Sequence, residues 1–502
     1  MFSNISKASE NRVASTLSDI ADYSHKQFAE LFHKCNKDKY IFSDKTGWYS
    51  YDKYNILVSY GKQCPTSMLV DVQSFLCDYI KEHMKGIDVI DDISKKNFDK
   101  LFKAYQKVSS SPYTQGILIE LPHYYLNDEI DEKIDAVPHL IAFKDKVYDI
   151  NNGYYRDIEK SDFILRNTGY EAPELTDDFS LIDNLIMSIF EDREVADYFL
   201  LITAMSLFTN KFEKLYILTG NGRNGKGVVS SIISKALGKY YLTGSNDLLT
   251  CKDEMKNETL AKSVGIRYLA VSEPAEDSEK ELKFNISMVK KLTGRDVLST
   301  RALYKNSFEF IPRFTVFVSC NEPPTVDETN EAIRNRFRFI HFPFTFVENP
   351  TRSYERKIDV NLKDKIDNET EYRDGMISYL LHLLYINRDI KKIKEPAKCN
   401  TFTKTYFDNN ADVANFLEKY FIITDDPKDR MRPNELFQMF SADGDYKKLS
   451  TVKFSSGLKS ANIRKDKING SLYYVGIKKK DNEDSDDECD FKQDPNKNAL
   501  SI

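Results

Sequence analysis

Three short apolar runs, two of them ending in a polar residue, stand out in the pattern of hydrophobic and polar positions. They cover residues 215–219, 267–273 and 314–321, and the last two end in Glu273 and Asn321. Apolar runs without alternation are typical of parallel strands, which are buried on both faces of a sheet. The chain is therefore predicted to contain a buried parallel sheet.

The first 170 residues have a more mixed pattern and are predicted to form a separate unit. Aromatic residues flank a turn at residues 44–47, which predicts a small sheet within residues 39–60. Helical spacing covers residues 71–84 and 96–108, and residues 140–155 alternate around two turns. Further helices are predicted at the following positions: 180–190, 193–207 and 368–387.

The pattern after residue 410 predicts three helices followed by a hairpin. The helices cover residues 412–420, 433–440 and 450–461, and the hairpin turns at Asn469 and Gly470. This order suggests a winged helix, which could contact DNA or protein. The charged residues 478–502 have no means of forming a core and are expected to be disordered.

Composition indicates a globular protein, which would bind any nucleic acid through local basic patches. The chain has 502 residues, 41% of them hydrophobic, and a net charge of −6. Its seven cysteines are scattered with no pair at zinc spacing, which favours reduced thiols and an intracellular setting. No apolar run is long enough to suggest a signal peptide or membrane span, so no membrane partner is expected.

A glycine-rich loop follows the first apolar run and has the spacing of a nucleotide phosphate-binding loop, although an ordinary glycine-rich turn is the alternative. Its backbone N–H groups and Lys226 would hold phosphates at the start of a helix. Gly227 stands where a Ser or Thr usually supplies a hydroxyl to Mg²⁺. The predicted nucleotide-binding residues are Gly220, Asn221, Gly222, Arg223, Asn224, Gly225, Lys226, Gly227 and Val228.

Polar residues after this loop appear in the order that ATP hydrolysis needs. Glu273 could hold Mg²⁺, partly through water, and align the attacking water. Asn321 could sense the γ-phosphate, and a cluster of three arginines follows at Arg334, Arg336 and Arg338. Each alone could be a strand end or a solvated strip, but together they favour an ATPase.

A basic segment lies between the second and third apolar runs. Residues 283–316 hold seven basic residues against two acidic ones, and they contain a predicted hairpin with a polar tip at residues 304–307. Such a segment could bind DNA backbone and stack a base, or could be a solvated hairpin. The candidate DNA-binding residues are Lys291, Arg301, Tyr304 and Lys305.

Together these motifs resemble the helicase part of the primase-helicases of poxviruses, giant viruses and satellite phages, which belong to the superfamily 3 helicases on the AAA+ fold. The resemblance covers residues 71–477 and includes the motif at 290–296. It implies that Lys226 is the phosphate lysine, Glu273 the catalytic carboxylate and Asn321 the sensor. It also implies that Arg336 is the arginine finger, with Arg334 as the alternative, and that Lys305 lies on a hairpin in the channel of a ring.

The resemblance implies a multidomain α/β protein with an AAA+-type P-loop core and a parallel sheet. Helices at 176–210 would form a collar, or would simply pack within one subunit. The expected domains are an N-terminal α+β domain (1–175), the collar (176–210), the ATPase core (211–350), a helical extension (351–405), a winged helix (406–477) and an acidic tail (478–502).

The resemblance implies ATP- and Mg²⁺-dependent unwinding of single-stranded and forked DNA by a homo-oligomeric ring, which it implies to be a hexamer. No room is left upstream for a primase domain, so a separate primase or polymerase partner is expected, in a host cytoplasm or viral replication compartment. Two alternatives stay open. One is a nucleotide-dependent DNA-binding or origin scaffold with weak hydrolysis, and the other is a motor that packages genomes or remodels RNA or protein.

Overall fold

A computed structural model describes most of the chain. The described residues are 23–208, 212–245, 247–250, 258–272, 284–294, 296–301, 307–321, 323, 331–424, 426–446, 449–461, 463–468 and 470–480. They fall into two compact units. The larger holds the described residues within Met1–Lys280, Ser287–Pro323 and Arg336–Asn400, and the smaller holds those within Glu281–Ile286, Pro324–Asn335 and Thr401–Ile502.

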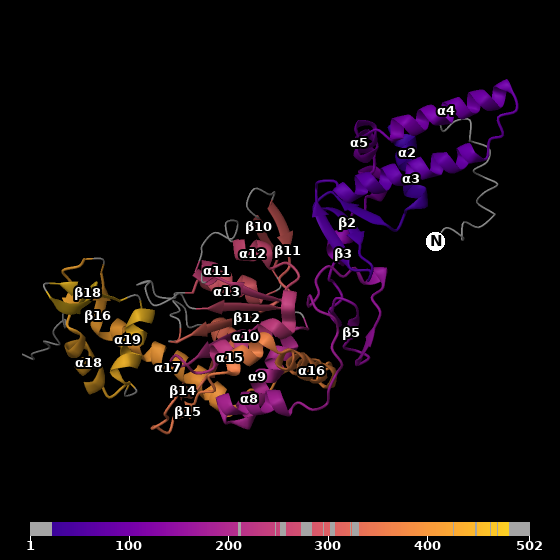
Figure 1. The fold of residues 1–502 in the computed structure, drawn as a ribbon. Helices are drawn as coiled ribbons and strands as arrows, with labels where there is room; N and C mark the ends of the chain where they lie inside the picture. Colours follow the sequence, from indigo (N-terminus) through magenta and orange to yellow (C-terminus); the bar gives the residue numbers. More distant parts are fainter. Residues whose placement is uncertain are drawn as a thin grey trace, which may run out of the picture. The chain divides into compact units, whose positions relative to one another are not determined.

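A five-stranded sheet forms the centre of the larger unit (Figure 1). Its order is β13-β7-β12-β9-β8, and every neighbouring pair is parallel. The strands are β7 (Leu215–Thr219), β8 (Tyr241–Gly244), β9 (Tyr268–Ser272), β12 (Thr315–Cys320) and β13 (Phe337–His341). The three apolar runs thus form β7, β9 and β12, and the predicted parallel sheet is confirmed.

Stacked aromatic rings cross this sheet from β8 to β7. The rings of Tyr241 and Tyr268 lie 5.2 Å apart, those of Tyr268 and Phe317 4.0 Å apart, and those of Phe317 and Tyr216 5.1 Å apart. Tyr268, Phe317 and Tyr216 are buried. Aromatic pairs of this kind contribute about 0.5–1.5 kcal/mol each beyond the burial of their area, so the ladder ties four strands together.

Helices that lie before, between and after these strands in the sequence share the main apolar core with the sheet. They are α8 (Ser180–Phe190), α9 (Arg193–Ser206), α10 (Lys226–Leu237), α15 (Leu362–Asn368) and α16 (Glu371–Ile386). The side chain of Asp192 caps α9 by accepting the N–H of Val195. The predicted helices at 180–190, 193–207 and 368–387 are confirmed, and α8 and α9 pack within one chain. Whether they also form a collar stays a prediction.

The N-terminal part of the larger unit has a core of its own. It contains α2 (His25–Cys35), β1 (Tyr40–Ser43), β2 (Gly47–Tyr51), β3 (Leu57–Gly61), α3 (Thr66–Lys85), α4 (Asp92–Val108), α5 (Ser111–Glu120), α6 (Pro122–Tyr125) and α7 (Ile130–Lys133). Buried residues of these elements, from Phe28 to Tyr125, form one cluster. The strands pair in the order β1-β2-β3, which confirms the small sheet predicted there.

A three-stranded antiparallel sheet follows, formed by β4 (Leu140–Ala142), β5 (Val147–Asp149) and β6 (Tyr154–Arg156). Ile141 and Tyr148 of this sheet, with Phe143 just after β4, belong to the core of the five-stranded sheet. The cluster from Phe28 to Tyr125 is separate. The expectation that the first 170 residues form one separate unit is therefore corrected, because their last part packs on the central sheet. The alternation of residues 140–155 does not by itself indicate what these strands pack against.

The smaller unit contains the predicted three helices and hairpin. Its elements are the end of α17 (Ala397–Tyr420), β16 (Phe421–Ile423), β17 (Arg430–Met431), α18 (Pro433–Ala442), α19 (Thr451–Ser460), β18 (Arg464–Ile468), β19 (Ser471–Val475) and β20 (Ile477–Lys479). Ser450 caps α19 through the N–H of Lys453, and β18 pairs antiparallel with β19. Because α17 is continuous, the expected boundary at residues 405–406 falls inside a helix. The winged-helix assignment stays a prediction. The expected start of the disordered tail at residue 478 is corrected, because Lys478 and Lys479 belong to β20 and pair with β16. Residues 481–502 lie outside the described residues.

Within the described ranges, no helix combines the length and the apolar character needed to cross a bilayer.

Candidate nucleotide-binding site

The glycine-rich loop joins the carboxyl end of β7 to the amino end of α10. Gly220 has a φ of +154° and Gly225 a φ of +88°. A Cβ atom on Gly220 would lie 2.1 Å from Nδ2 of Asn224 and 2.7 Å from the carbonyl oxygen of Phe342, so only glycine fits there. The loop therefore closes tightly over itself and delivers the first turn of α10 to the edge of the sheet.

Lys226 is the first residue of α10, and its ammonium lies between the loop and a neighbouring strand. Its Nζ donates to the carbonyl oxygen of Gly220 at 2.7 Å and to Oδ1 of Asn321 at 3.4 Å. These residues meet because β7 and β12 are parallel neighbours, with Thr219 opposite Cys320. The structure thus brings together two of the predicted site residues, from positions 95 residues apart.

Asn224 is a buried polar residue inside the loop, with 3% of its surface exposed. Its Oδ1 accepts the backbone N–H of Lys226 at 3.4 Å, which orients the amide. Among the described residues, none accepts a hydrogen bond from its Nδ2. A buried donor without an acceptor costs about 1–3 kcal/mol, so the loop is suited to a ligand that supplies oxygen atoms. The positive end of the α10 dipole favours the same anionic ligand.

The position of Gly227 leaves room for a larger residue. No atom lies within 4 Å of the place that a Cβ on Gly227 would take, and the residue is exposed in the first turn of α10. The loop therefore fits phosphate well through its backbone, Asn224 and Lys226. It offers no hydroxyl for Mg²⁺ at this position, although a serine would fit.

Glu273 lies outside the described residues, so its predicted role stays a prediction. The strand that leads to it is described: Ser272, the last residue of β9, is opposite Ser319 of β12. The carboxyl ends of β9, β12 and β7 therefore point to the same edge of the sheet, as parallel strands require.

His341 is a polar residue of this edge that the sequence analysis did not select. It ends β13, opposite Thr219 of β7, and its Nδ1 lies 3.3 Å from Oγ1 of Thr219. Partial loss of water around the ring and the positive charge of Lys226 lower the pKa of His341 below its usual 6.5. Its imidazole is therefore neutral at pH 7. Knowledge that β13 pairs with β7 would have been needed to place it here.

The three clustered arginines each have an acidic partner in their own chain. Arg336, at the end of α14 (Glu331–Arg336), lies 3.8 Å from Glu213, and Arg334 lies 3.2 Å from Asp408. Arg338 forms an ion pair with Glu395, and its side chain is only 13% exposed. Arg338 is thus held inside one chain, whereas the pair of Arg336 is long and its partner is half exposed.

The predicted basic hairpin is confirmed for its strands. β10 (Leu298–Arg301) pairs antiparallel with β11 (Ser307–Phe310), with Arg301 opposite Ser307. Lys291 lies near the end of α13 (Ile286–Thr293). The tip residues Tyr304 and Lys305 lie outside the described residues, so their DNA-binding role stays a prediction.

Two protein families match parts of the chain. The D5 N terminal like family matches residues 29–190, and a family of unknown function, DUF5906, matches residues 218–336. A protein named "Putative helicase L207/L206" from Acanthamoeba polyphaga mimivirus is 26% identical over 354 residues, which are 67% of this chain and 36% of that protein. The D5 N terminal like match and this viral relative fit the viral primase-helicase family.

Other viral relatives carry the same kind of name. "Putative helicase 184R" of Invertebrate iridescent virus 6 is 28% identical over 343 residues, covering 62% of this chain and 35% of the relative. "Putative helicase V13" of Sputnik virophage is 24% identical over 279 residues, covering 54% and 35%. The chain thus spans about a third of the length of these viral relatives.

Among solved structures, the A form apo structure of the NrS-1 C terminal region aligns with 89% of this chain and 98% of that one. The TM-score is 0.44 and the identity 11%. That likeness is too weak to support a statement about the site.

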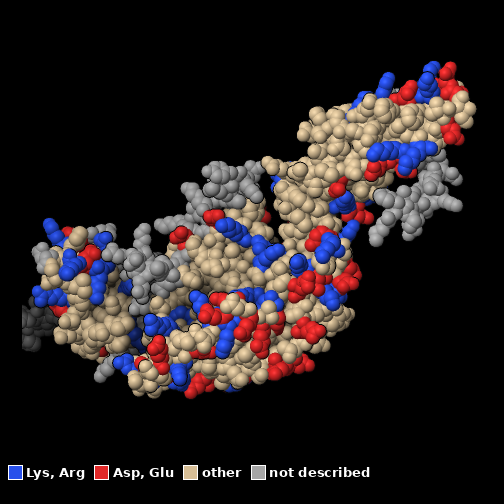
Figure 2. All heavy atoms as spheres, in the orientation of Figure 1, with Lys and Arg blue, Asp and Glu red and all other residues tan. Residues whose placement is uncertain are grey.

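Charge on the visible face is mixed. Figure 2 shows acidic and basic side chains interspersed, with the basic ones in separate groups. This mixed distribution agrees with the small net charge of −6 for 502 residues.

Proposed function

We propose that the chain is an ATP-dependent DNA helicase that acts in the replication of a viral or other mobile genome. The observation that carries this proposal is the contact of Lys226 with both Gly220 and Asn321 at the edge of the parallel sheet. A lysine at a helix start, beside a polar residue on the next strand, can hold a phosphate chain and respond to its terminal group.

In this proposal Lys226 leaves the carbonyl oxygen of Gly220 and turns to the β- and γ-phosphates of ATP. The buried Nδ2 of Asn224 donates to a phosphate oxygen, which satisfies its hydrogen-bonding capacity. Asn321 loses its contact with Lys226 and becomes free to sense the γ-phosphate. Glu273 orients the attacking water, and Mg²⁺ bound there would neutralise charge on the phosphates.

The proposal includes hydrolysis at the interface between two copies in a ring, in which Arg336 reaches the nucleotide of its neighbour. Its contact with Glu213 is 3.8 Å long, and the Glu213 side chain is 52% exposed, so this ion pair by itself contributes little to holding the guanidinium. Arg334 is the alternative finger, but its 3.2 Å contact with Asp408 and its position 5.4 Å over the ring of Phe407 hold it more firmly.

DNA would be moved by the hairpin formed by β10 and β11. Lys305 would contact backbone phosphate and Tyr304 would stack on a base, while Lys291 and Arg301 add positive charge to the same segment. Single-stranded and forked DNA would then be the ligands.

A strand-displacement assay on forked DNA tests this function. Lys305→Ala should retain ATP hydrolysis but lose unwinding, because the hairpin would no longer bind the DNA backbone. Forked RNA and blunt duplex DNA serve as control substrates. Unchanged unwinding by Lys305→Ala would remove the hairpin from the mechanism, and no unwinding by the unaltered chain would refute the helicase assignment.

A second candidate is a nucleotide-dependent DNA-binding scaffold with weak hydrolysis. It is favoured by Gly227, which leaves the loop without the usual hydroxyl for Mg²⁺. Phosphate release with and without single-stranded DNA separates the two candidates. Strong stimulation by DNA supports the helicase, whereas slow release that DNA leaves unchanged supports the scaffold.

A further inference from the structure

A cavity of about 320 Å³ lies in the N-terminal part of the larger unit, away from the glycine-rich loop in the sequence. Its walls come from the end of α2, from β1 and β2, from α6 and from the short helix η3 (Lys160–Asp162). Aromatic rings and two lysines line it. The residues that matter most are His33, Lys37, Tyr51, Tyr124, Tyr125 and Lys160.

The aromatic wall is fixed by contacts among its own members. The hydroxyl of Tyr125 donates to the carbonyl oxygen of Asn36 at 3.0 Å, and its ring meets His33 edge-on at 4.8 Å. The ring of Tyr124 lies 5.9 Å from that of His33, and its hydroxyl donates to the carbonyl oxygen of Lys26 at 3.3 Å. Since Tyr124 and His33 are only half-buried, a flat ligand could stack on them.

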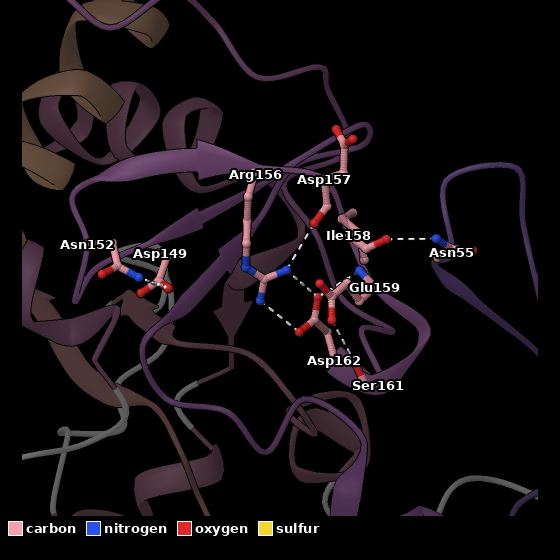
Figure 3. Close-up of polar contacts among 9 residues, drawn as sticks. All are labelled: Asn55, Asp149, Asn152, Arg156, Asp157, Ile158, Glu159, Ser161 and Asp162. Carbon is pink, nitrogen blue, oxygen red and sulfur yellow. Dashed lines mark hydrogen bonds and ion pairs between the residues drawn. The ribbon is translucent and has the colours of Figure 1, made fainter.

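Hydrogen bonds also fix the segment on either side of Lys160, as Figure 3 shows. Arg156 donates to both carboxylate oxygens of Asp162 at 2.8 Å, and Asn55 donates from Nδ2 to the carbonyl oxygen of Ile158 at 2.7 Å. These contacts hold the segment that carries Lys160. The Lys160 ammonium lies 5.2 Å over the ring of Tyr51 and donates to the carbonyl oxygen of Asp38 at 2.9 Å.

The polar groups around the cavity suit a base and a phosphate. Lys37 is exposed, and no described residue forms an ion pair with it or a hydrogen bond with the ring nitrogens of His33. Partial burial and the charge of Lys37 lower the pKa of His33, so its neutral ring can donate one hydrogen bond and accept another at pH 7. The exposed carboxylate of Asp38 opposes the two lysines and leaves a positive balance.

We propose that this cavity binds one nucleotide unit of single-stranded DNA, with the base against Tyr124 and His33 and the phosphate near Lys37 and Lys160. Aromatic surfaces beside lysines are the usual means of holding a single strand without reading its sequence. This site lies outside the ATPase and the hairpin, so it would hold DNA whether or not ATP is hydrolysed.

Photochemical crosslinking of the full chain tests the location. A twelve-residue oligothymidylate carrying one 5-iododeoxyuridine should crosslink to the peptide that contains Tyr124 or to the one that contains His33. Free thymidine monophosphate, which has the same base and phosphate, should compete far less well than unlabelled oligonucleotide. Crosslinks found only outside the cavity would overturn the proposal. Equal competition by the monophosphate would overturn the assignment to a strand.

Binding measured by fluorescence anisotropy without ATP tests the contacts. In a Lys305→Glu background, which weakens the proposed hairpin contact, Tyr124→Ala should weaken binding by about 5-fold or more, since one stacked base is worth about 1–3 kcal/mol. Tyr124→Phe should retain binding. Lys37→Glu should also weaken it and Asp38→Asn should strengthen it, whereas the matched control Lys103→Glu on α4 should change little.

The same measurement separates this site from the helicase proposal. Lys37→Glu alone should leave ATP hydrolysis without DNA unchanged, and circular dichroism confirms folding of each variant. Equal effects of Lys37→Glu and Lys103→Glu, together with full binding by Tyr124→Ala, would contradict the cavity even if unwinding is observed. Loss of unwinding by Lys305→Ala tests the hairpin alone.

Discussion

The polar and charged groups at the two ends of the central sheet differ in their exposure to solvent. At the carboxyl end, Lys226 is half-buried, Asn321 is exposed, and the contact between them is 3.4 Å long. At the amino end, Arg267 and Asp135 are only 2% and 7% exposed. Groups at the first end can change partners when a ligand arrives, whereas groups at the second end are enclosed.

The enclosed end joins residues 134–166 to the sheet. The carboxylate of Asp135 accepts the N–H groups of Leu165 at 2.9 Å and of Arg166 at 3.1 Å, and its carbonyl oxygen accepts from Arg313 at 2.6 Å. Burial raises the pKa of Asp135 and lowers that of Arg267. These buried charged groups stabilise the packing of residues 134–166 on the sheet. A charged residue beside a strand therefore does not by itself indicate a functional site.

The largest expected effect comes from Lys226→Ala at the open end. It should reduce ATP hydrolysis by about 10²- to 10³-fold, the usual loss when one donor to developing charge is removed. Stability should change little because the side chain is half-buried and makes exchangeable contacts. Phosphate release and chemical denaturation measure the two quantities. Strong destabilisation with retained hydrolysis would reverse the contrast between the two ends.

The complementary change is Asp135→Ala at the enclosed end. It leaves two buried backbone N–H groups without an acceptor, and should lower the free energy of unfolding by about 2–3 kcal/mol. Asp135→Asn is the matched control, because its remaining oxygen can still accept and asparagine tolerates the φ of +51°. Equal free energies of unfolding for the two variants in denaturant titrations would show that the hydrogen bonds accepted by the Asp135 side chain do not stabilise the fold.

Gly227→Ser sharpens the description of the open end. A Cβ added at this position has no atom within 4 Å, so a serine fits and would supply the missing hydroxyl. The Mg²⁺ concentration for half-maximal hydrolysis should fall by about 2- to 10-fold, the value of one hydrogen-bond-sized contact. Gly227→Ala controls for helix propensity. An equal response to both substitutions would mean that the hydroxyl does not reach the metal.

The smallest effect concerns the pH dependence of stability at His341. Because folding lowers the pKa of His341, the unfolded chain binds more protons between that pKa and the ordinary 6.5. The contribution of His341 to the free energy of unfolding therefore rises with pH in this window. That contribution is lost as the pH falls below 6.5. His341→Gln should show a shallower loss in denaturation at several pH values. Identical slopes would exclude His341 as a contributor.

Local pattern predicted the strands of the site and most helices. Unbroken apolar runs identified β7, β9 and β12, and the residue after β12 identified Asn321, which the structure places beside Lys226. The pairing of β13 with β7, which places His341, depends on sheet order that no single run contains.

The contacts at the enclosed end could not be predicted from the sequence, for a related reason. Arg166 donates to the carbonyl oxygen of Lys239, 73 residues away, and the carboxylate of Asp135 accepts from backbone 30 residues away. Contacts between a side chain and distant backbone leave no periodic signal in the sequence. The same holds for β4 and β5, whose alternation predicts a buried face but not the helices that cover it.

Mixing two inactive variants tests the central claim most directly. Lys226→Ala lacks the phosphate lysine but keeps Arg336, and Arg336→Ala has the reverse arrangement. If each nucleotide is shared by two copies, the mixture should hydrolyse ATP well above either variant alone, because some interfaces receive both groups. Activity of the mixture no greater than the mean of its parts, with full activity of Arg336→Ala on its own, would contradict the account.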